Sequence, residues 1–123
     1  MKIVQSEALF KHKGDDVFLF TLRNKAGVEV CISNLGTIIQ SFKVPDRDEN
    51  VLDIVLGFDT MEHYLSSEYL NNNSYLGAIV GRYANRVGNA SIVIDGERYQ
   101  LSPNRPPHQI HGGFEGFESK VWH

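Results

Sequence analysis

Two short polar segments carry the residues of this chain best suited to chemistry. Asn85 and Arg86 end the segment GRYANR, and His111 stands directly before Gly112 and Gly113. A guanidinium offers five donors in a rigid fork, an amide offers both donors and an acceptor, and an imidazole can donate or accept near neutral pH. Side chains of these types are suited to holding the vicinal hydroxyls of a neutral, hydroxyl-rich ligand.

Each of these residues also has a plainer interpretation when it is taken alone. Arg82 and Arg86 are equally typical of surface or loop-bracing cations, and His111 of a loop histidine bonded to a backbone carbonyl. A metal site built from His108, His111 and His123 is a third interpretation. The spacing H-x₂-H is too loose to specify zinc, however, and no cysteine supports it.

Composition excludes several classes of protein. The chain has 123 residues, 41% of them hydrophobic and 22% charged, which is typical of one soluble globular domain. A net charge of −3 leaves no basic surplus for a nucleic-acid partner. No apolar run approaches the ~20 residues of a membrane span, and the N-terminus lacks the apolar core of a signal peptide. Cys31 is the only cysteine, so we expect no disulfide and a cytoplasmic protein.

The elements that must position these side chains are predicted to be β-strands. Val17–Leu22 is predicted as one strand, and Thr37–Val44 as another, rich in β-branched and aromatic residues. Val28–Ser33 alternates in the manner of a half-buried strand, with Val28, Val30 and Ile32 on its apolar face. Val51–Leu56 is almost continuously apolar, which predicts a strand buried on both faces.

Turn signals separate these runs. Asn34-Leu35-Gly36 predicts a turn with Gly36 at positive φ. Asp59–Tyr69 is expected to be a loop with at most one helical turn. Ser91–Leu101 contains Asp95-Gly96 between two β-rich runs, which predicts a hairpin closed by a type I′ turn. Strands at roughly ten-residue spacing predict an all-β fold, an antiparallel β-sandwich.

The order of these segments resembles the aldose 1-epimerase (galactose mutarotase) family. The resemblance rests on GRYANR at 81–86, the hairpin ending in DGxxYxL, and HGGxxGF at 111–117 followed by Trp122. LGFDTMEHYL at 56–65 and NLGTIIQSFKVPD at 34–46 also fit the family. Such motif matches predict both a fold and a site.

The resemblance implies a galactose mutarotase-like supersandwich, of which residues 1–123 would be the N-terminal part of a single domain, incomplete because the chain is truncated. It implies an isomerase that interconverts the α and β anomers of free aldohexoses such as galactose and glucose by acid/base ring opening. The partner would be a monosaccharide. The resemblance implies no metal and no organic cofactor.

Carried over residue by residue, the resemblance makes Asn85 and Arg86 the sugar-contacting pair and His111 an active-site histidine. Arg82 would brace the loop. The family's general acid, a second histidine beyond the HGG segment, and its glutamate base have no match within residues 1–123. We therefore expect a chain that holds sugar but lacks the proton-transferring groups. A non-catalytic carbohydrate-binding fragment and a structural fragment without a ligand remain alternatives.

A truncated sandwich should also leave apolar surface without partners. We expect exposed strand edges that favour self-association and marginal stability. Phe114, Phe117, Val121 and Trp122 are the residues expected to lack packing partners.

Overall fold

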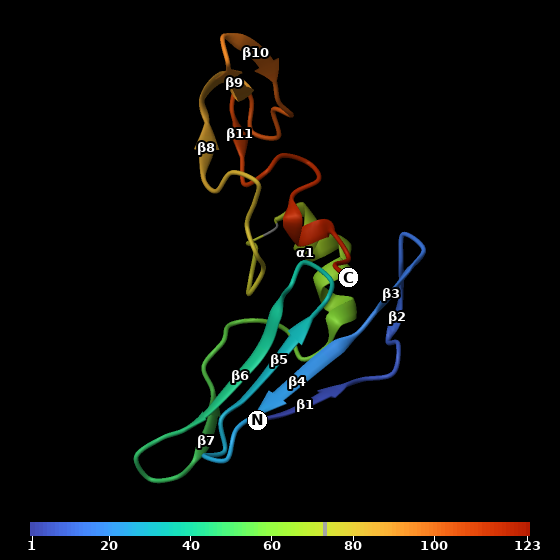
Figure 1. The fold of residues 1–123 in the computed structure, drawn as a ribbon, viewed down its shortest axis with the longest axis vertical. Helices are drawn as coiled ribbons and strands as arrows, with labels where there is room; N and C mark the ends of the chain where they lie inside the picture. The colour runs from blue at the N-terminus through green and yellow to red at the C-terminus, as the bar shows by residue number, and fades with distance from the viewer. Residues whose placement is uncertain (73) are drawn as a thin grey trace.

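Antiparallel strands and four short helices make up the computed structural model, which describes residues 1–72 and 74–123. Figure 1 shows an elongated molecule, with a twisted sheet at one end and a smaller part that carries β8 to β11 at the other. The strands are β1 (Lys2–Gln5), β2 (Phe10–His12), β3 (Asp15–Val17), β4 (Leu19–Arg23), β5 (Glu29–Ser33), β6 (Ile39–Pro45), β7 (Val51–Asp53), β8 (Arg86–Val87), β9 (Ser91–Ile94), β10 (Glu97–Gln100) and β11 (Gln109–Ile110). The helices are the 3₁₀ helices η1 (Met61–Leu65), η2 (Gly88–Ala90) and η3 (Phe117–Ser119) and the α-helix α1 (Ser67–Asn71).

The main sheet has five antiparallel strands in the order β1-β4-β5-β6-β7. The strand predicted over Val17–Leu22 is divided in the structure into β3 and β4. The break falls at Phe18, whose N–H donates to Asn34 Oδ1 at 2.8 Å instead of to a neighbouring strand. β3 then pairs with β2 in a separate hairpin, while β4 joins the sheet.

The burial of β5 differs from the predicted pattern. Glu29 and Ser33, on the face expected to be polar, are 9% and 1% exposed, whereas Val30 and Ile32 are only half-buried. Both polar groups have partners: Glu29 pairs with Arg23 and with Lys43 on the flanking strands, and Ser33 Oγ accepts the Leu35 N–H at 3.0 Å. Buried polar side chains are stable when they are paired in this way.

The prediction that Val51–Leu56 is buried on both faces is wrong. β7 covers only Val51–Asp53, at the edge of the sheet, where β6 is its partner. Val51, Leu52, Ile54 and Leu56 are 56%, 53%, 61% and 78% exposed. A run of apolar residues indicates a strand, but its position in the sheet decides its burial.

The segment 59–69 is more helical than expected, because η1 is followed directly by α1. Ser66 caps α1, its Oγ accepting the Tyr69 N–H at 3.3 Å. Tyr64 and Tyr69 pack edge-on against Phe58, with ring centroids 5.1 and 5.2 Å away. Aromatic contacts of this geometry add to the free energy of area burial. The fully buried core residues lie between these helices and the end of the sheet: Val17, Leu35, Ile38, Met61 and Tyr64.

The hairpin prediction is confirmed. β9 and β10 pair antiparallel, with Ile94 opposite Glu97. Asp95 and Gly96 between them have φ of 52° and 83°, as a type I′ turn requires.

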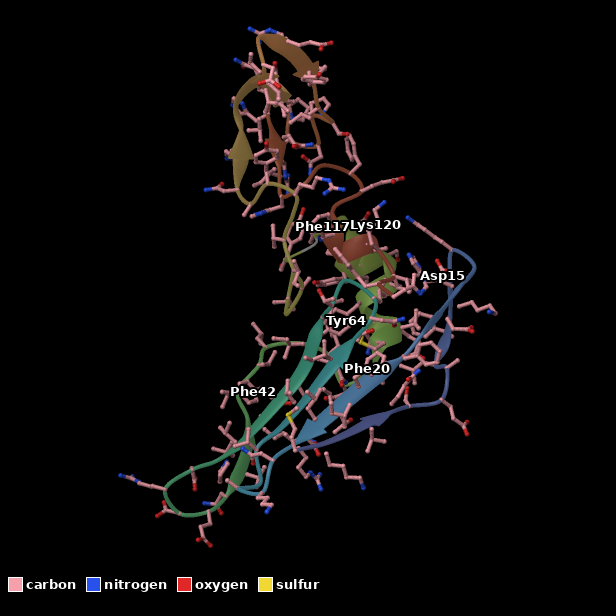
Figure 2. The ribbon with its side chains drawn as sticks, viewed as in Figure 1. Asp15, Phe20, Phe42, Tyr64, Phe117 and Lys120 are labelled. Atoms are coloured by element: carbon pink, nitrogen blue, oxygen red, sulfur yellow. The ribbon has the colours of Figure 1, made fainter. Side chains whose placement is uncertain are left out.

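The C-terminal segment returns to the main sheet at the loop that follows β5. Leu35 forms an isolated antiparallel bridge with Val121, and Gly36 N–H donates to Lys120 O at 2.7 Å. Gly36 has a φ of 61°, as predicted, and a Cβ there would lie 2.5 Å from Glu118 O. Figure 2 shows Phe117 and Lys120 beside the helices at the end of the sheet.

This packing corrects the expectation that the C-terminal apolar residues lack partners. Phe117 and Trp122 pack edge-on with ring centroids 5.0 Å apart, and Val121 packs against the core. Phe114 remains 71% exposed, as expected. None of the helices in the described part of the chain has the length and apolar character of a membrane-spanning segment.

Candidate functional site

A short antiparallel pair brings the two polar segments of the sequence together. β8 pairs with β11, with Arg86 opposite Ile110 and Val87 opposite Gln109. Asn85 lies directly before β8, and His111 directly after β11. Residues 26 positions apart in the sequence are therefore neighbours at one end of this pair.

Asn85 and His111 are joined by two reciprocal hydrogen bonds. The His111 N–H donates to Asn85 O at 3.0 Å, and the Asn85 N–H donates to the imidazole Nδ1 of His111 at 3.1 Å. Because Nδ1 accepts a hydrogen bond, the proton of the neutral imidazole is on Nε2. The backbone of one site residue thus selects the tautomer of the other.

Both residues have left-handed backbone conformations, with φ of 57° at Asn85 and 52° at His111. Asparagine adopts this region with little strain, but histidine does so less often. Backbone strain of this kind costs about 1–3 kcal/mol per residue and tends to occur at functional sites. The two reciprocal bonds are the local interactions that hold this conformation.

A glycine contact fixes the HGG loop against the start of the GRYANR segment. Gly112 has a φ of 92°, and a Cβ on it would overlap the carbonyl oxygen of Gly81. Gly81 O in turn accepts the Phe117 N–H at 3.2 Å. A side chain at position 112 would therefore separate the two segments that position Asn85 and His111.

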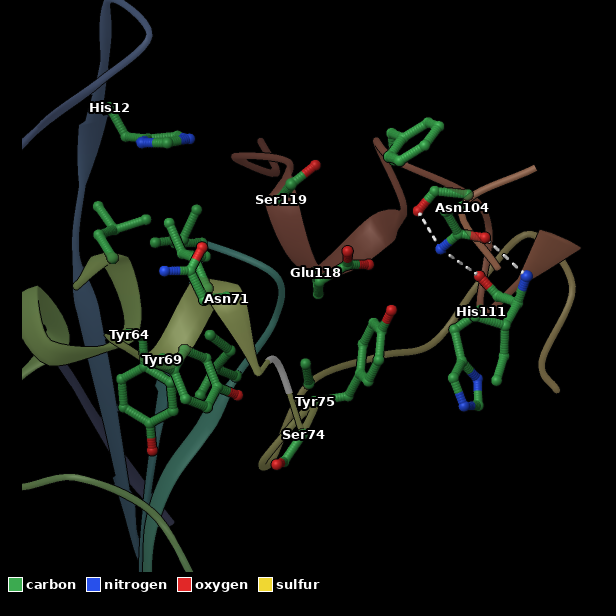
Figure 3. A pocket seen from close by; sticks show the side chains of 18 of the residues that line it. His12, Tyr64, Tyr69, Asn71, Ser74, Tyr75, Asn104, His111, Glu118 and Ser119 are labelled. Carbon is green, nitrogen blue, oxygen red and sulfur yellow. Dashed lines mark hydrogen bonds between the residues drawn. The ribbon is translucent and has the colours of Figure 1, made fainter. Parts of the chain in front are cut away.

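Asn104 holds the segment on both sides of His111. Its Nδ2 donates to Ile110 O at 3.0 Å and to Gly113 O at 3.1 Å, and its Oδ1 accepts the Ile110 N–H at 2.8 Å. Figure 3 shows Asn104 beside His111 with its hydrogen bonds. No local sequence pattern indicates this role, because the three bonds exist only once the loop has folded.

A cavity of about 850 Å³ lies between the His111 loop and the helical end of the sheet. His111 lines it, whereas Asn85 and Arg86 are exposed residues outside its lining. Tyr75 also lines the cavity and contacts His111, with ring centroids 4.7 Å apart and the ring planes tilted by 54°. Tyr75 was not predicted from the sequence; an aromatic residue shortly before the GRYANR segment was the available signal.

Glu118 is the one carboxylate among the described residues that line this cavity. Its Oε2 is buried and has no hydrogen-bond partner among residues 1–72 and 74–123. Burial raises the pKa of the Glu118 carboxyl above its ordinary value. Burial also raises the pKa of the Tyr75 hydroxyl above its ordinary value.

The remaining candidate residues have structural contacts. The Arg82 guanidinium lies 5.3 Å from the centroid of the Phe117 ring, which fits the predicted bracing role. His108 Nδ1 accepts the Asn89 N–H at 3.1 Å, and His123 Nε2 lies 3.8 Å from Asp15 Oδ1. In the part of the chain that the structure describes, no three His, Cys, Asp or Glu residues form a group that could hold a metal ion.

Three donor groups are left for a ligand. Within the described residues, the side-chain amide of Asn85, the guanidinium of Arg86 and Nε2 of His111 have no hydrogen-bond partner. An imidazole Nε2–H, an amide and a guanidinium can bind hydroxyl and ring oxygens without introducing an acidic group.

Fold and site together define an all-β protein with antiparallel sheets and an exposed polar loop site. The aldose 1-epimerase family model matches residues 19–123, and the chain belongs to this family. It is 39% identical over 109 residues to galactose mutarotase of Rattus norvegicus and 38% identical to aldose 1-epimerase of Escherichia coli K12. Each match covers 89% of this chain, which spans 30% of the length of either relative.

The fold is shared with solved members of the family. The crystal structure of galactose 1-epimerase from Lactobacillus acidophilus superposes with a TM-score of 0.77 at 27% sequence identity. The likeness covers 98% of this chain and 33% of that one. The antiparallel all-β fold expected from the sequence, of the galactose mutarotase type, is confirmed.

Proposed function

We propose that this chain carries the sugar-holding residues of an aldose 1-epimerase that interconverts the α and β anomers of free aldohexoses such as galactose and glucose. The observation that carries the proposal is the reciprocal pair of hydrogen bonds between Asn85 and His111, at 3.0 and 3.1 Å. This pair joins the segments that carry Asn85, Arg86 and His111, on the fold of a mutarotase family. The names of the relatives, galactose mutarotase and aldose 1-epimerase, support the reaction and the substrate class.

In the proposed mechanism, Asn85 and Arg86 hold sugar hydroxyls and orient the pyranose ring. His111 donates from Nε2 to a sugar oxygen near the anomeric carbon and stabilises the charge that develops there during ring opening. A base takes the proton of the anomeric hydroxyl and an acid protonates the ring oxygen. Rotation about C1–C2 and reclosure then invert the anomeric centre. We assign these two proton transfers to residues of the whole enzyme other than Asn85, Arg86 and His111.

This proposal includes the organisation of the protein. Residues 1–123 belong to one β-sandwich domain of a cytoplasmic enzyme that uses a monosaccharide and needs neither a metal nor an organic cofactor. The chain spans 30% of its relatives, so the activity of the whole enzyme is proposed here from family membership and from the site.

Titration by NMR and polarimetry together test the proposal. The 123-residue protein is expected to bind galactose or glucose saturably, with shifts at the Asn85 and His111 amides, and to give no measurable anomerisation. His111→Ala should abolish binding, whereas Arg47→Ala, at a side chain 93% exposed, should not. Absence of binding, or anomerisation by residues 1–123 that disappears in His111→Ala, contradicts the proposal.

A non-catalytic carbohydrate-binding module is the second candidate. It is favoured by the fact that the side chains of Asn85, Arg86 and His111 suit sugar binding as hydrogen-bonding groups alone. Polarimetry on the product of the complete reading frame separates the two candidates. Accelerated anomerisation identifies the enzyme, and sugar binding without acceleration identifies the module.

We also propose that the edges of the main sheet mediate self-association. β1 and β7 each pair on one side, with β4 and β6. Ile3 and Leu52 on these edge strands are 58% and 53% exposed. Unpaired strand edges with apolar side chains are templates for pairing with another chain.

A further inference from the structure

We propose that Tyr75 is a positioning residue for His111: it holds the imidazole so that Nε2 faces the sugar. This inference rests on the proposed function, because it concerns the orientation of a sugar-binding group. Tyr75 was not among the residues singled out by the sequence, and it acts through His111 and not on the sugar itself.

The contact between the Tyr75 and His111 rings restrains the imidazole in a way that its hydrogen bond alone does not. The Asn85 N–H fixes one edge of the imidazole by binding Nδ1. A single hydrogen bond to a ring edge still allows the ring to tilt about that bond. The Tyr75 ring makes a second, tilted contact with the imidazole, with its centroid 4.7 Å from that of His111 and an angle of 54° between the ring planes. The hydrogen bond and the ring contact together restrain the imidazole, and Nε2 is the ring nitrogen that we assign to the ligand.

The backbone around this contact indicates that its geometry is imposed by the fold. Tyr75, Asn85 and His111 have φ of 55°, 57° and 52°. Left-handed conformations occur in a few per cent of non-glycine residues and are least favourable for bulky ones. Three such residues meet at one imidazole, and strain of this kind persists where the surrounding structure determines it.

Tyr75 connects the main sheet to the His111 loop. Leu76 N–H donates to the Tyr69 hydroxyl at 2.9 Å, and Gly77 O accepts the Ile39 N–H from β6 at 2.9 Å. The residues directly after Tyr75 are therefore fixed to α1 and to the sheet. His111 directly follows β11, which lies in the smaller part of the molecule (Figure 1). The contact between the Tyr75 and His111 rings therefore links the main sheet to the smaller part of the molecule at the imidazole.

The test is a comparison of Tyr75→Phe, Tyr75→Leu and Tyr75→Ala by ¹⁵N NMR of the His111 side chain. In the wild-type protein and in Tyr75→Phe, the spectrum should show Nδ1 as the unprotonated nitrogen and Nε2 as the protonated one. In Tyr75→Leu and Tyr75→Ala, the two nitrogen shifts should move toward each other as the second tautomer becomes populated. Galactose affinity should fall about 2- to 10-fold in these two variants, the range expected for loss of an aromatic contact.

Tyr83→Ala is the matched control, because Tyr83 is 48% exposed and lies in the GRYANR segment, outside the lining of the cavity. It should leave both the tautomer and the affinity unchanged. Tyr75→Leu keeps most of the buried volume, so it remains informative if Tyr75→Ala does not fold. Wild-type tautomer signals in Tyr75→Leu overturn the inference. If the wild-type protein binds no sugar, the proposed function fails, but the ¹⁵N measurement still decides whether Tyr75 positions His111.

Discussion

Asn85 and His111 each donate a backbone N–H to the other, one bond ending on a carbonyl oxygen at 3.0 Å and the other on an imidazole nitrogen at 3.1 Å. The second bond leaves the Asn85 side chain out of the pairing, because the backbone alone makes it. The amide side chain and the backbone of Asn85 therefore have separable roles, and a substitution can remove one while keeping the other.

Asn85→Gly is expected to weaken sugar binding without loss of stability. Glycine adopts the φ of 57° at this position without strain and keeps the N–H that binds His111. The free energy of unfolding should stay within about 1 kcal/mol of the wild-type value or rise. Galactose affinity should fall about 5- to 10-fold through loss of the amide hydrogen bonds. Urea unfolding and NMR titration measure the two quantities, and unchanged affinity contradicts the assignment of Asn85.

Gly112→Ala is expected to disrupt the site and the fold around it. The added Cβ would overlap Gly81 O at a residue whose φ is 92°. Overpacking and backbone strain together should lower the free energy of unfolding by about 2–4 kcal/mol. Gly88→Ala is the control, since a Cβ there meets nothing within 4 Å. Equal effects of the two substitutions in urea unfolding would show that the contact with Gly81 is unimportant.

Glu29 should make the protein less stable in acid. The hydrogen bond from Arg23 holds the pKa of the Glu29 carboxyl below its ordinary value, with Lys43 adding to the effect. The resulting stabilisation is present above the unfolded-state pKa of about 4.3 and is lost as the pH falls through the lower folded value. Glu29→Gln should lower the free energy of unfolding by about 1 kcal/mol at pH 7 and reduce the loss of stability at acid pH. Urea unfolding midpoints measured from pH 2.5 to 7 test this prediction. If the loss of stability at acid pH is the same in Glu29→Gln as in the wild type, Glu29 is not its cause.

Glu118 should have the opposite pH dependence. Its folded-state pKa is raised by burial, so ionisation is harder in the folded protein than in the unfolded chain. Stability should therefore fall as the pH rises from about 4.3 through the raised folded value. Glu118→Gln should remove this loss and stabilise the protein at pH 7 by up to about 1 kcal/mol, since the side chain is only half-buried. A variant less stable than the wild type at pH 7 contradicts the predicted sign.

Leu52→Lys should reduce self-association. Leu52 is 53% exposed on the edge strand β7, where a charged side chain opposes pairing with a second chain. Sedimentation velocity should show a smaller fraction of oligomer at equal concentration. Leu70→Lys is the control, because Leu70 is similarly exposed, at 51%, but lies on α1. Identical behaviour of the two variants would indicate general solubility and not an edge contact.

The sequence predicted those features whose physical cause is local. The turn at Asp95-Gly96 depends on two residues that tolerate positive φ, so the hairpin could be found from the chain alone. The burial of Val51–Leu56 could not, because it depends on which strand lies at the edge of the sheet. The short helices at 61–71 also lacked a sequence signal, since neither is long enough to show a helical period.

The site shows the same division. Residue type and motif order predicted Asn85, Arg86 and His111 as candidate site residues, and the structure brings their segments together through β8 and β11. Tyr75 and Asn104 were missed, because their contacts with the His111 loop depend on the folded path of two other segments. Groups that position a site are harder to predict than groups that bind, since their chemistry alone does not distinguish them.

The bridge between Leu35 and Val121 sets an order of events during synthesis. The loop at Leu35 is made early, but its partner leaves the ribosome 86 residues later (121 − 35). Until then, the Gly36 N–H that will donate to Lys120 O and the Asn34 carbonyl that will accept the Trp122 N–H stay open to water. Closing a loop of this length costs conformational entropy, and contacts between distant residues therefore form slowly. We therefore expect β4 and β5 to form on the nascent chain well before the loop around His111 acquires its final geometry.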